Sequence, residues 1–541
     1  MASARIALAQ MNPVVGDIDG NTDKLVSMIE RARNEGADIV VFPELVLTGY
    51  PPEDLLLRPS LELRIERALK RIEQASDGIC VVLGFPAVRA GGLFNAAAVF
   101  EDRRLLLEYH KHVLPNYQVF DEMRYFTKGD DPAVFEWRGH NIAVSICEDI
   151  WHEGPMAMAR AAGARLMLNI NASPYHIGKQ QEREHNLSQR VQQGDMPIAY
   201  VNMVGGQDEL VFDGGSCVMS AEGEVCYRAD DSSEQLLFTD WTCKEDLWVP
   251  ALGHREPLAS ELASMYQQLV TGVKDYVNKN GFRGVVLGLS GGIDSALTLA
   301  IAVDALGADR VEAVMMPFRY TSGMSLEDAE QEAKTLGVGY RVLSIEPIYD
   351  AFMATLSESF EGTEVDTTEQ NIQARARGVL LMALSNKKGY LVLTTGNKSE
   401  MAVGYSTLYG DMAGGFDVLK DVSKARVFAL SRYRNEVSPV IPQRVIDRPP
   451  SAELAPDQKD EDNLPPYEVL DQILELYVEK DESAEAIIAR GFEREDVLRV
   501  IRLVDINEYK RRQAPIGTRI TLRGFGRDRR YPITNRWTMG D

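Results

Sequence analysis

Cysteine is scarce in this sequence: only five of the 541 residues are cysteine, an odd number. No two of them have the C-x-x-C spacing that is typical of zinc sites and redox motifs. A small, odd number of cysteines without that spacing is typical of a protein from a reducing compartment. We therefore expect reduced thiols in a cytoplasmic protein, and neither a disulfide framework nor a zinc site.

Basic residues and long apolar runs are lacking too. The chain has 58 Lys and Arg against 81 Asp and Glu, a formal net charge of −23, which argues against nucleic acid or an anionic membrane as partner. No stretch approaches the roughly 18 apolar residues of a membrane span, and no apolar run follows a basic start, so we expect no signal peptide and no membrane span. The length predicts two to four domains.

The segment 285–303, VVLGLSGGIDSALTLAIAV, predicts a buried strand, a tight glycine turn and a helix. Glycines let backbone N–H groups approach phosphate oxygens, and the first helical turn leaves its N–H donors unpaired. Ser290 and Ser295 would add hydroxyl donors, and Asp294 would ligate the Mg²⁺ that accompanies a nucleotide. The segment therefore predicts a nucleotide phosphate site.

This turn is neither a Walker A loop, since it lacks the lysine, nor a Rossmann G-x-G-x-x-G turn. The alternative is a purely structural turn in which the glycines only relieve strain. The hexapeptide SGGIDS (residues 290–295) resembles the signature of the N-type ATP pyrophosphatases. The resemblance implies a loop that binds the pyrophosphate leaving group while a substrate oxygen is adenylated.

The first half alternates short strands with helices, which predicts a layered α/β or αββα domain. Glu44, Lys111 and Cys147 each follow a strand-like segment. Such residues can hydrolyse an amide: the thiolate attacks the carbonyl, the ammonium lowers the thiol pKa and stabilises the oxyanion, and the carboxylate moves the proton. Taken singly, each has an ordinary structural role, as a core thiol, a solvated lysine or a capping acid.

Three segments, FPEL, YHKHVLPN and ICEDIW, surround these positions. They resemble, in the same order, the three motifs of the nitrilase superfamily. The resemblance implies an αββα sandwich with Glu44 as base, Lys111 as electrostatic stabiliser and Cys147 as nucleophile. It also suggests Glu122 as a second glutamate and a glutamine-binding set made of Tyr117, Ser173 and Lys179.

Residues 230–260 show no clear core pattern and predict a crossover between domains. We place the boundary near residue 250, giving domains 1–250 and 251–541. Residues 21–34 predict a helix capped by Asn21 or Thr22, and residues 260–278 predict an amphipathic helix.

In the second half, alternating strands and helices after the glycine turn predict a doubly wound parallel sheet with ligand sites at the carboxyl strand ends. Residues 320–325 predict a mobile loop, before a helix whose cap is Ser325. Residues 442–466, rich in proline and acids, predict a loop that is poorly ordered without substrate. Residues 510–541 hold nine basic and two acidic residues, cations that an acidic protein could use to bind an anionic dinucleotide.

Five motifs across this half resemble the NAD synthetase family in order: SGGIDS, NIQARAR, TTGNKSEMAVGYSTLYGD, PPSAELAPDQKDEDNLPPY and YKRRQAPIG. A nitrilase-type domain in front matches the glutamine-dependent form of the family. The resemblance implies adenylation of deamido-NAD by ATP with release of pyrophosphate, then displacement of AMP by ammonia made from L-glutamine at Cys147.

By position, the resemblance assigns ATP contacts to Gly288, Leu289, Ser290, Gly291, Gly292, Ile293, Asp294, Ser295, Thr395, Lys424 and Ser451. It assigns deamido-NAD contacts to Asn371, Arg375, Glu400, Asp417 and Lys510, and Mg²⁺ ligation to Asp294 and Glu400. Ammonia-only members carry a lysine in the segment matching YSTLYGD, and residues 406–408 here have none.

Two alternatives remain open. One is an amidotransferase that adenylates another acceptor, as in GMP or asparagine synthesis; the basic tail and the nitrilase-type glutaminase argue against it. The other is a non-catalytic binding protein with decayed sites, against which the intact motifs argue. We expect a homo-oligomer that acts on small-molecule substrates, with Mg²⁺ as its only cofactor.

Overall fold

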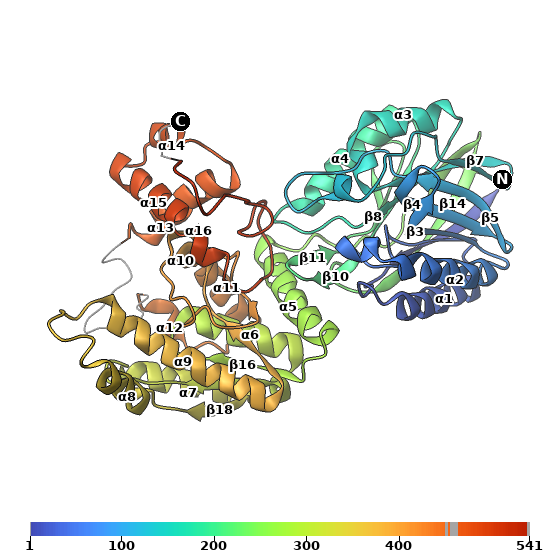
Figure 1. The fold of residues 1–541 in the computed structure, drawn as a ribbon. Coiled ribbons are helices and arrows are strands. Elements are labelled where there is room, and N and C mark those ends of the chain that lie inside the picture. Colours follow the sequence, from blue (N-terminus) through green and yellow to red (C-terminus); the bar gives the residue numbers. More distant parts are fainter. Residues whose placement is uncertain (1, 450–452, 455–463, 538–541) are drawn as a thin grey trace. The chain divides into compact units, whose positions relative to one another are not determined.

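The computed structural model describes residues 2–449, 453–454 and 464–537. The chain folds into two compact units, Met1–Ala259 and Ser260–Asp541 (Figure 1). Each unit has its own sheets and its own buried core, and each is described by itself.

The first unit contains two large stacked sheets. The seven-stranded sheet runs in the order β15 (Leu247–Pro250), β14 (Gln235–Lys244), β1 (Ser3–Gln10), β2 (Ile39–Val41), β3 (Cys80–Arg89), β4 (Gly92–Glu101), β5 (Arg104–His110). The six-stranded sheet runs in the order β13 (Val225–Arg228), β12 (Cys217–Met219), β9 (Ile198–Asn202), β8 (Met167–Asn171), β7 (His140–Ile146), β6 (Val134–Trp137). A small hairpin adds β10 (Val204–Gln207) and β11 (Leu210–Asp213).

Helices cover the outer face of each sheet. Figure 1 shows α1 (Ile18–Asn34) and α2 (Pro59–Ala75) on one side of the strands, and α3 (Glu153–Ala161) and α4 (Lys179–Gly194) on the other. Between the sheets lies a fully buried apolar layer that includes Ile6, Val82, Ile146 and Leu168. This layering confirms the predicted αββα sandwich, in which both sheets bury their inner faces against each other.

Two predictions for this unit were wrong in detail. Helix α1 begins at Ile18, because Asp17, and not Asn21 or Thr22, accepts the backbone N–H of Gly20 (3.0 Å). The supposed crossover at residues 230–260 contains β14 and β15. Residues 235–242 of β14 pair with the whole of β1, and the residues of β14 alternate between buried and exposed after Phe238. This period-two pattern is present in the sequence, but the acids, proline and glycines around it favoured the interpretation as a crossover.

The second unit is built on a five-stranded parallel sheet in the order β18 (Gly339–Val342), β17 (Val311–Met315), β16 (Gly284–Gly288), β19 (Tyr390–Thr394), β20 (Phe416–Asp417). The chain leaves β16 first toward β17 and β18, and later returns to its other side as β19. This order confirms the predicted doubly wound sheet and puts its topological switch point between β16 and β19, where such sheets bind ligands.

The helices that accompany this sheet are α5 (Glu261–Lys279), α6 (Ile293–Leu306), α7 (Gly323–Leu336), α8 (Glu346–Leu356), α9 (Thr367–Lys388), α10 (Lys398–Val403), α11 (Lys424–Val437) and α12 (Gln443–Asp447). A further group of helices closes the chain: α13 (Tyr467–Leu474), α14 (Ala484–Ala489), α15 (Arg494–Ile506) and α16 (Glu508–Arg511). This group packs around a core of its own that also includes Ala402 and Val403 of α10.

Three sequence predictions differ from the structure here: the mobile loop 320–325, the helix cap Ser325 and the loop 442–466. Residues 320–325 contain the start of α7. The cap of this helix is Ser322, since its Oγ accepts the Ser325 N–H (3.2 Å). Within residues 442–466 the helix α12 forms, and residues 450–452 and 455–463 lie outside the described part.

The basic C-terminal residues are largely paired with acids of the same unit. Ion pairs join Arg511 to Glu508, Arg519 to Asp528, Arg523 to Asp481 and Arg529 to Asp505. These four arginines therefore have partners within the protein, and a role in binding a dinucleotide stays a prediction for this segment.

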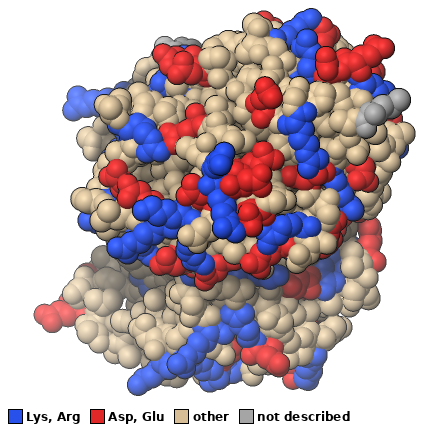
Figure 2. Space-filling model, turned by 90° about the vertical axis from the view of Figure 1, so that its right-hand side faces the viewer, with Lys and Arg blue, Asp and Glu red and all other residues tan. Residues whose placement is uncertain are grey.

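On the molecular face shown in Figure 2, basic and acidic side chains lie interspersed. Among the described residues, no helix combines the length and the apolar character needed to cross a membrane.

Candidate functional site

Two carboxylates share one ammonium in the first unit. Lys111, directly after β5, donates from Nζ to Glu44 Oε1 (2.7 Å) and to Glu122 Oε1 (2.9 Å). All three side chains are at most 5% exposed. The structure thus brings together the two predicted residues Glu44 and Lys111, together with Glu122, from segments that are 67 and 11 residues apart.

Neighbouring donors fix this cluster. Asn95 of β4 donates to Glu44 Oε1 (2.7 Å), and the backbone N–H of Ala172 donates to Glu44 Oε2 (3.0 Å). Tyr50 donates to Glu122 Oε1 (3.0 Å). With both Glu44 oxygens held, its carboxylate has one orientation, as a general base requires.

Burial changes the proton affinities in the cluster. Desolvation raises the pKa of Glu122 to about 7, although Lys111 opposes the rise. The pKa of Lys111 lies well above its ordinary value, because the carboxylates of Glu122 and Glu44 outweigh its burial. The ammonium therefore stays charged, which suits a group that stabilises an oxyanion.

Cys147 follows β7 at once and has a left-handed backbone, φ 42°. A non-glycine residue rarely adopts this conformation, and it turns the side chain out of the strand at the carboxyl end of the sheet. Burial and Glu44 raise the pKa of the thiol well above its ordinary value, and Lys111 only partly offsets this. The ammonium lowers the thiol pKa as expected, but burial and Glu44 outweigh it, so the net pKa is raised and the proton must leave to a base.

Asp149 connects the lysine segment to the cysteine turn, and sequence reasoning missed this role. Its Oδ1 accepts the N–H groups of His112 (3.1 Å) and Val113 (2.9 Å), and its Oδ2 accepts that of Ile146 (3.0 Å). These bonds fix the backbone beside Lys111 relative to Cys147. The residue stands in ICEDIW, so the motif contained the signal, but its partners are far away in sequence.

The three predicted glutamine contacts have other partners in the structure. Tyr117 donates to both oxygens of Glu148 (3.0 and 3.1 Å), and Lys179 lies over the Trp151 ring (4.1 Å). Burial and Glu148 raise the pKa of Tyr117, and burial and Arg183 lower that of Lys179; Cys147 makes a smaller contribution to both shifts, which indicates that both side chains lie near the thiol.

Ser173 is buried, and its Oγ accepts a bond from Arg183 (3.2 Å). Arg183 in turn forms a buried ion pair with Asp213 (2.7 Å).

In the second unit, the glycine turn joins β16 to α6 as predicted. Gly291 has φ +80°, and a Cβ there would lie 2.4 Å from the carbonyl oxygen of Ser325, so only glycine fits. The serine hydroxyls, expected as phosphate donors, bond to each other (3.1 Å), and Ser295 Oγ also accepts the Ser290 N–H (3.2 Å). They hold the shape of the loop.

A cavity of about 230 Å³ opens at this turn, at the carboxyl ends of β16 and β19. Its lining includes Gly288, Leu289, Ser290, Thr394 and Thr395. This is the switch point of the doubly wound sheet, so a nucleotide placed here would lie against the N-terminus of α6.

Beside the turn, two acids converge on one cation. Lys424 Nζ lies 2.6 Å from Asp294 Oδ2 and 3.2 Å from Glu400 Oε1, and Asn397 donates to Asp294 Oδ1 (2.9 Å). Asp294 is in the first turn of α6 and Glu400 in that of α10. Two carboxylates that reach one positive group also fit a divalent cation with oxygen ligands, such as Mg²⁺.

Three residues expected at the dinucleotide contact the segment 404–408. Asn371 Oδ1 accepts from Thr407 (2.9 Å), Arg375 donates to the Leu408 carbonyl (3.2 Å), and Lys510 donates to the carbonyls of Gly404 (2.7 Å) and Ser406 (2.9 Å). Lys510 thus brings an ammonium to the segment that lacks the family lysine.

The other two, Glu400 and Asp417, line a second, small cavity of about 20 Å³ together with Ser406 and Asp411. Burial raises the pKa of Asp417 to about 7, although Lys420 opposes the rise. Ser451 lies outside the described residues.

Comparison with known proteins covers both units. Residues 5–244 match the carbon-nitrogen hydrolase family and residues 265–514 the NAD synthase family. The chain is 51% identical over 547 residues to the glutamine-dependent NAD(+) synthetase of Acinetobacter baylyi, with full coverage of both, and 45% identical to that of Thermotoga maritima, with 99% of each covered. A solved structure of the Acinetobacter baumannii enzyme in complex with ADP is 49% identical, covers all of both chains and superimposes with a TM-score of 0.81.

Proposed function

The chain belongs to the family of glutamine-dependent NAD(+) synthetases, and from that premise we propose which of its residues perform each step. The protein is a C–N ligase of NAD biosynthesis, which amidates deamido-NAD with ATP and nitrogen from glutamine. The assignment rests on the presence of two sites in one chain. The first unit contains the buried Glu44–Lys111 cluster, and the second contains the glycine turn at the switch point of its sheet.

In the first unit, the Cys147 sulfur attacks the side-chain amide carbon of glutamine and forms a tetrahedral adduct. Glu44 accepts the thiol proton, because the raised pKa of this thiol means that it is protonated at rest. The Lys111 ammonium stabilises the oxyanion, and ammonia leaves with a proton returned by Glu44. Glu44 then activates the water that releases glutamate from the thioester.

Glutamine recognition in this proposal rests on Tyr117, Ser173 and Lys179. Lys179 and Tyr117 are supported by their electrostatic coupling to Cys147. Ser173 is supported less directly, since its hydroxyl already accepts a bond from Arg183, which leaves its proton and one lone pair for a ligand.

In the second unit, the turn from Gly288 to Ser295 and the adjoining Thr395 bind ATP. The N–H groups at the start of α6 contact phosphate oxygens, and Gly291 lets the loop pass close to Ser325. Asp294 and Glu400 would hold Mg²⁺, which would neutralise phosphate charge. Lys424, which pairs with both acids, would then contribute its ammonium to the phosphates. Ser451 completes the proposed set.

Deamido-NAD contacts Asn371, Arg375, Glu400, Asp417 and Lys510. Three of these side chains support the segment 404–408, and the other two line the adjoining cavity. The position of Lys510 supports its role as the cation that replaces the missing family lysine.

The test is NAD formation from deamido-NAD and ATP, run in parallel with glutamine and with ammonia. The proposal requires product with both donors, together with AMP and pyrophosphate. If the protein were instead an amidotransferase for another acceptor, deamido-NAD would give no product while glutaminase activity remained. A binding protein with decayed sites would give neither.

We also propose that the enzyme works in the cytoplasm as a homo-oligomer. The five cysteines, all among the described residues, are free thiols, which supports a reducing compartment. Sedimentation of the purified chain would give the oligomer number.

A further inference from the structure

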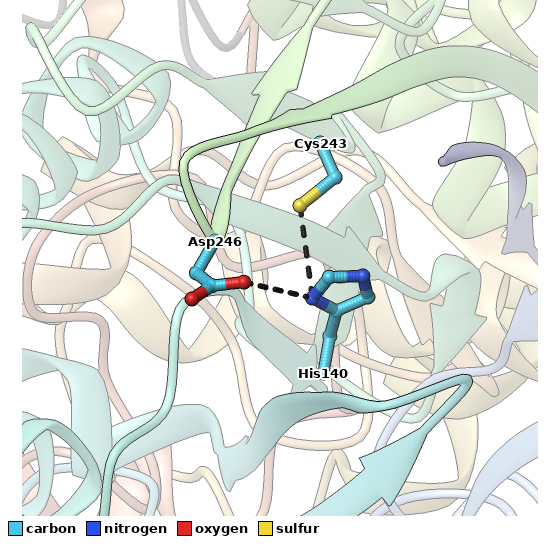
Figure 3. A group of neighbouring side chains, drawn as sticks. All are labelled: His140, Cys243 and Asp246. Atoms are coloured by element: carbon cyan, nitrogen blue, oxygen red, sulfur yellow. Dashed lines mark hydrogen bonds and ion pairs between the residues drawn. The ribbon is translucent and has the colours of Figure 1, made fainter. Parts of the chain in front are cut away.

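Three metal-ligating side chains meet at one edge of the first unit, away from the glutaminase residues. Figure 3 shows the Cys243 sulfur and an Asp246 carboxylate oxygen both directed at the same ring nitrogen of His140. Cys243 Sγ and Asp246 Oδ1 each lie 3.7 Å from His140 Nδ1, and the three ligand atoms lie within 4.8 Å of one another.

The Cys243–His140 separation is that of a hydrogen bond to sulfur, but the Asp246–His140 separation suits a shared ion better than a direct contact. An N–H···O bond is normally about 2.7–3.2 Å long, whereas the Asp246–His140 distance is 3.7 Å. In tetrahedral Zn²⁺ geometry, with Zn–S about 2.3 Å and Zn–N and Zn–O about 2.1 Å, neighbouring ligand atoms stand about 3.4–3.6 Å apart. The two separations of 3.7 Å from His140 Nδ1 are within a few tenths of an ångström of those values.

The fold builds the group from two hairpins, one in each sheet. Trp137 and His140 are paired across the turn between β6 and β7, and Cys243 and Trp248 are paired at the end of the β14–β15 hairpin. The latter turn consists of Glu245 and Asp246, both with positive φ (49° and 65°). A turn of this twist fixes strand register, so it fixes the position of Asp246 next to His140.

The surroundings resemble the outer shell of a metal centre. Trp248 packs edge-on against the His140 ring (5.3 Å between centroids), and Trp137 packs against Trp248 (5.9 Å). Cys243 is buried in the core between the sheets, while the Asp246 side chain is 85% exposed. One side of the group is therefore apolar and rigid, and the other gives an ion access from solvent.

We propose that His140, Cys243 and Asp246 bind a divalent transition-metal ion, for which Zn²⁺ is the best match, with water as the fourth ligand. A thiolate, a carboxylate and a neutral imidazole balance the charge of the ion. On binding, the Cys243 thiol proton is released to solvent and no group is oxidised or reduced.

The ion would act as a structural clip. His140 starts β7 of the six-stranded sheet, and Cys243 is the last residue but one of β14 in the seven-stranded sheet, so one ion joins the two layers of the sandwich. Cys147 stands at the opposite end of β7, about 20 Å away at the usual rise of a strand. The expected effect is on the stability of the sandwich, with no step in the chemistry.

Sequence spacing does not reveal such a site, because His140 and Cys243 are 103 residues apart. The expectation that the chain has no zinc site came from the absence of C-x-x-C spacing. The proposal therefore replaces that expectation on the basis of geometry.

The test uses the full chain with Cys147→Ala, so that the catalytic thiol cannot bind the probes. After treatment with a chelator, the protein is titrated with Zn²⁺, and separately with Co²⁺, whose thiolate charge-transfer absorption reports a sulfur ligand. We expect about one ion per chain, a cobalt–thiolate band, and a rise of about 5 °C in the unfolding midpoint of the first unit at a hundredfold excess over Kd.

Three variants identify the ligands. His140→Ala and Asp246→Asn should each weaken Zn²⁺ binding at least about tenfold, the lower end of the roughly 10–100-fold loss that an outer-shell change causes. Cys243→Ser should remove the cobalt band. Asp246 is exposed, so its variant tests the site without a folding defect. The matched control is Glu245→Gln, which removes the same charge from the same turn and should bind Zn²⁺ as the parent does.

Equal weakening by Glu245→Gln and Asp246→Asn would mean a diffuse charge effect and would overturn the proposal. So would the absence of a cobalt band in the parent, or loss of binding with His254→Ala in place of His140→Ala. The latter outcome would assign the ion to the more exposed group Asp230, His254 and Glu256, which has no sulfur ligand.

Discussion

Replacement of Lys111 by methionine tests the electrostatic core of the glutaminase. The change keeps most of the side-chain volume but removes the ammonium that bonds to Glu44 (2.7 Å) and Glu122 (2.9 Å). Removal of one partner of a buried ion pair costs about 3–5 kcal/mol, against a typical domain stability of about 5–15 kcal/mol. The variant should fold, with a clearly lowered unfolding midpoint for the first unit.

Activity should fall by more than stability explains. Loss of one oxyanion-stabilising donor typically lowers kcat about 10²–10³-fold, and we expect a loss of that size in glutamate release from glutamine. Synthesis from ammonia should remain, since its residues belong to the second unit with its own core. Circular dichroism and the ammonia-dependent rate together check that the protein is folded.

The double variant Lys111→Met/Glu122→Gln separates the two roles. It removes one of the two carboxylates that the lost ammonium had neutralised, so much of the lost stability should return. The glutaminase rate should stay as low as in the single variant, with Glu122→Gln alone as reference. Recovery of the wild-type rate in the double variant would refute our reasoning, because Lys111 would then serve only to neutralise the buried carboxylates.

Three further predictions concern the second unit. Asp294→Asn should impair Mg²⁺-ATP use and leave glutamine hydrolysis unchanged when no synthesis occurs; unchanged ATP kinetics would make Asp294 a structural residue of the turn. Gly291→Ala should abolish ATP use, since its Cβ would lie 2.4 Å from a carbonyl oxygen, whereas Gly292→Ala, at 3.3 Å from its nearest neighbour and with φ −85°, should be much milder. Burial raises the pKa of Asp417 from its usual 3.8 to about 7. Between these two values the folded state binds the proton and the unfolded state does not. The free energy of unfolding should therefore fall by about 4 kcal/mol as the pH rises from 3.8 to 7. In Asp417→Asn, thermal unfolding over this pH range should show no such fall.

The residues to which we assign the chemistry could be named from the sequence because each belongs to a short continuous segment. Glu44, Lys111 and Cys147 follow strands β2, β5 and β7, and parallel or stacked strands bring their ends together. The turn SGGIDS could be predicted for the same reason: a strand, glycines and a helix start are all local features.

What could not be predicted depends on contacts between distant segments. Asp149 receives N–H groups from the segment after Lys111, and Asn95 reaches Glu44 across 51 residues. The alternation in β14 was visible in the sequence, but its importance comes from pairing with β1, more than 220 residues earlier. The lowering effect of Lys111 on the Cys147 pKa could be predicted, but the net rise could not, because burial, which outweighs it, is a property of the packed sandwich.

The central claim is that two separable sites, one in each unit, perform the reaction, and Cys147→Ala tests it most directly. The measurement is NAD formation from deamido-NAD and ATP by wild type and variant, with glutamine or with ammonia as donor. We predict that the variant makes no NAD from glutamine and keeps its rate with ammonia, because only the sulfur is lost. Loss with both donors would contradict the separation of the sites, and retained synthesis from glutamine would show that Cys147 is not the nucleophile.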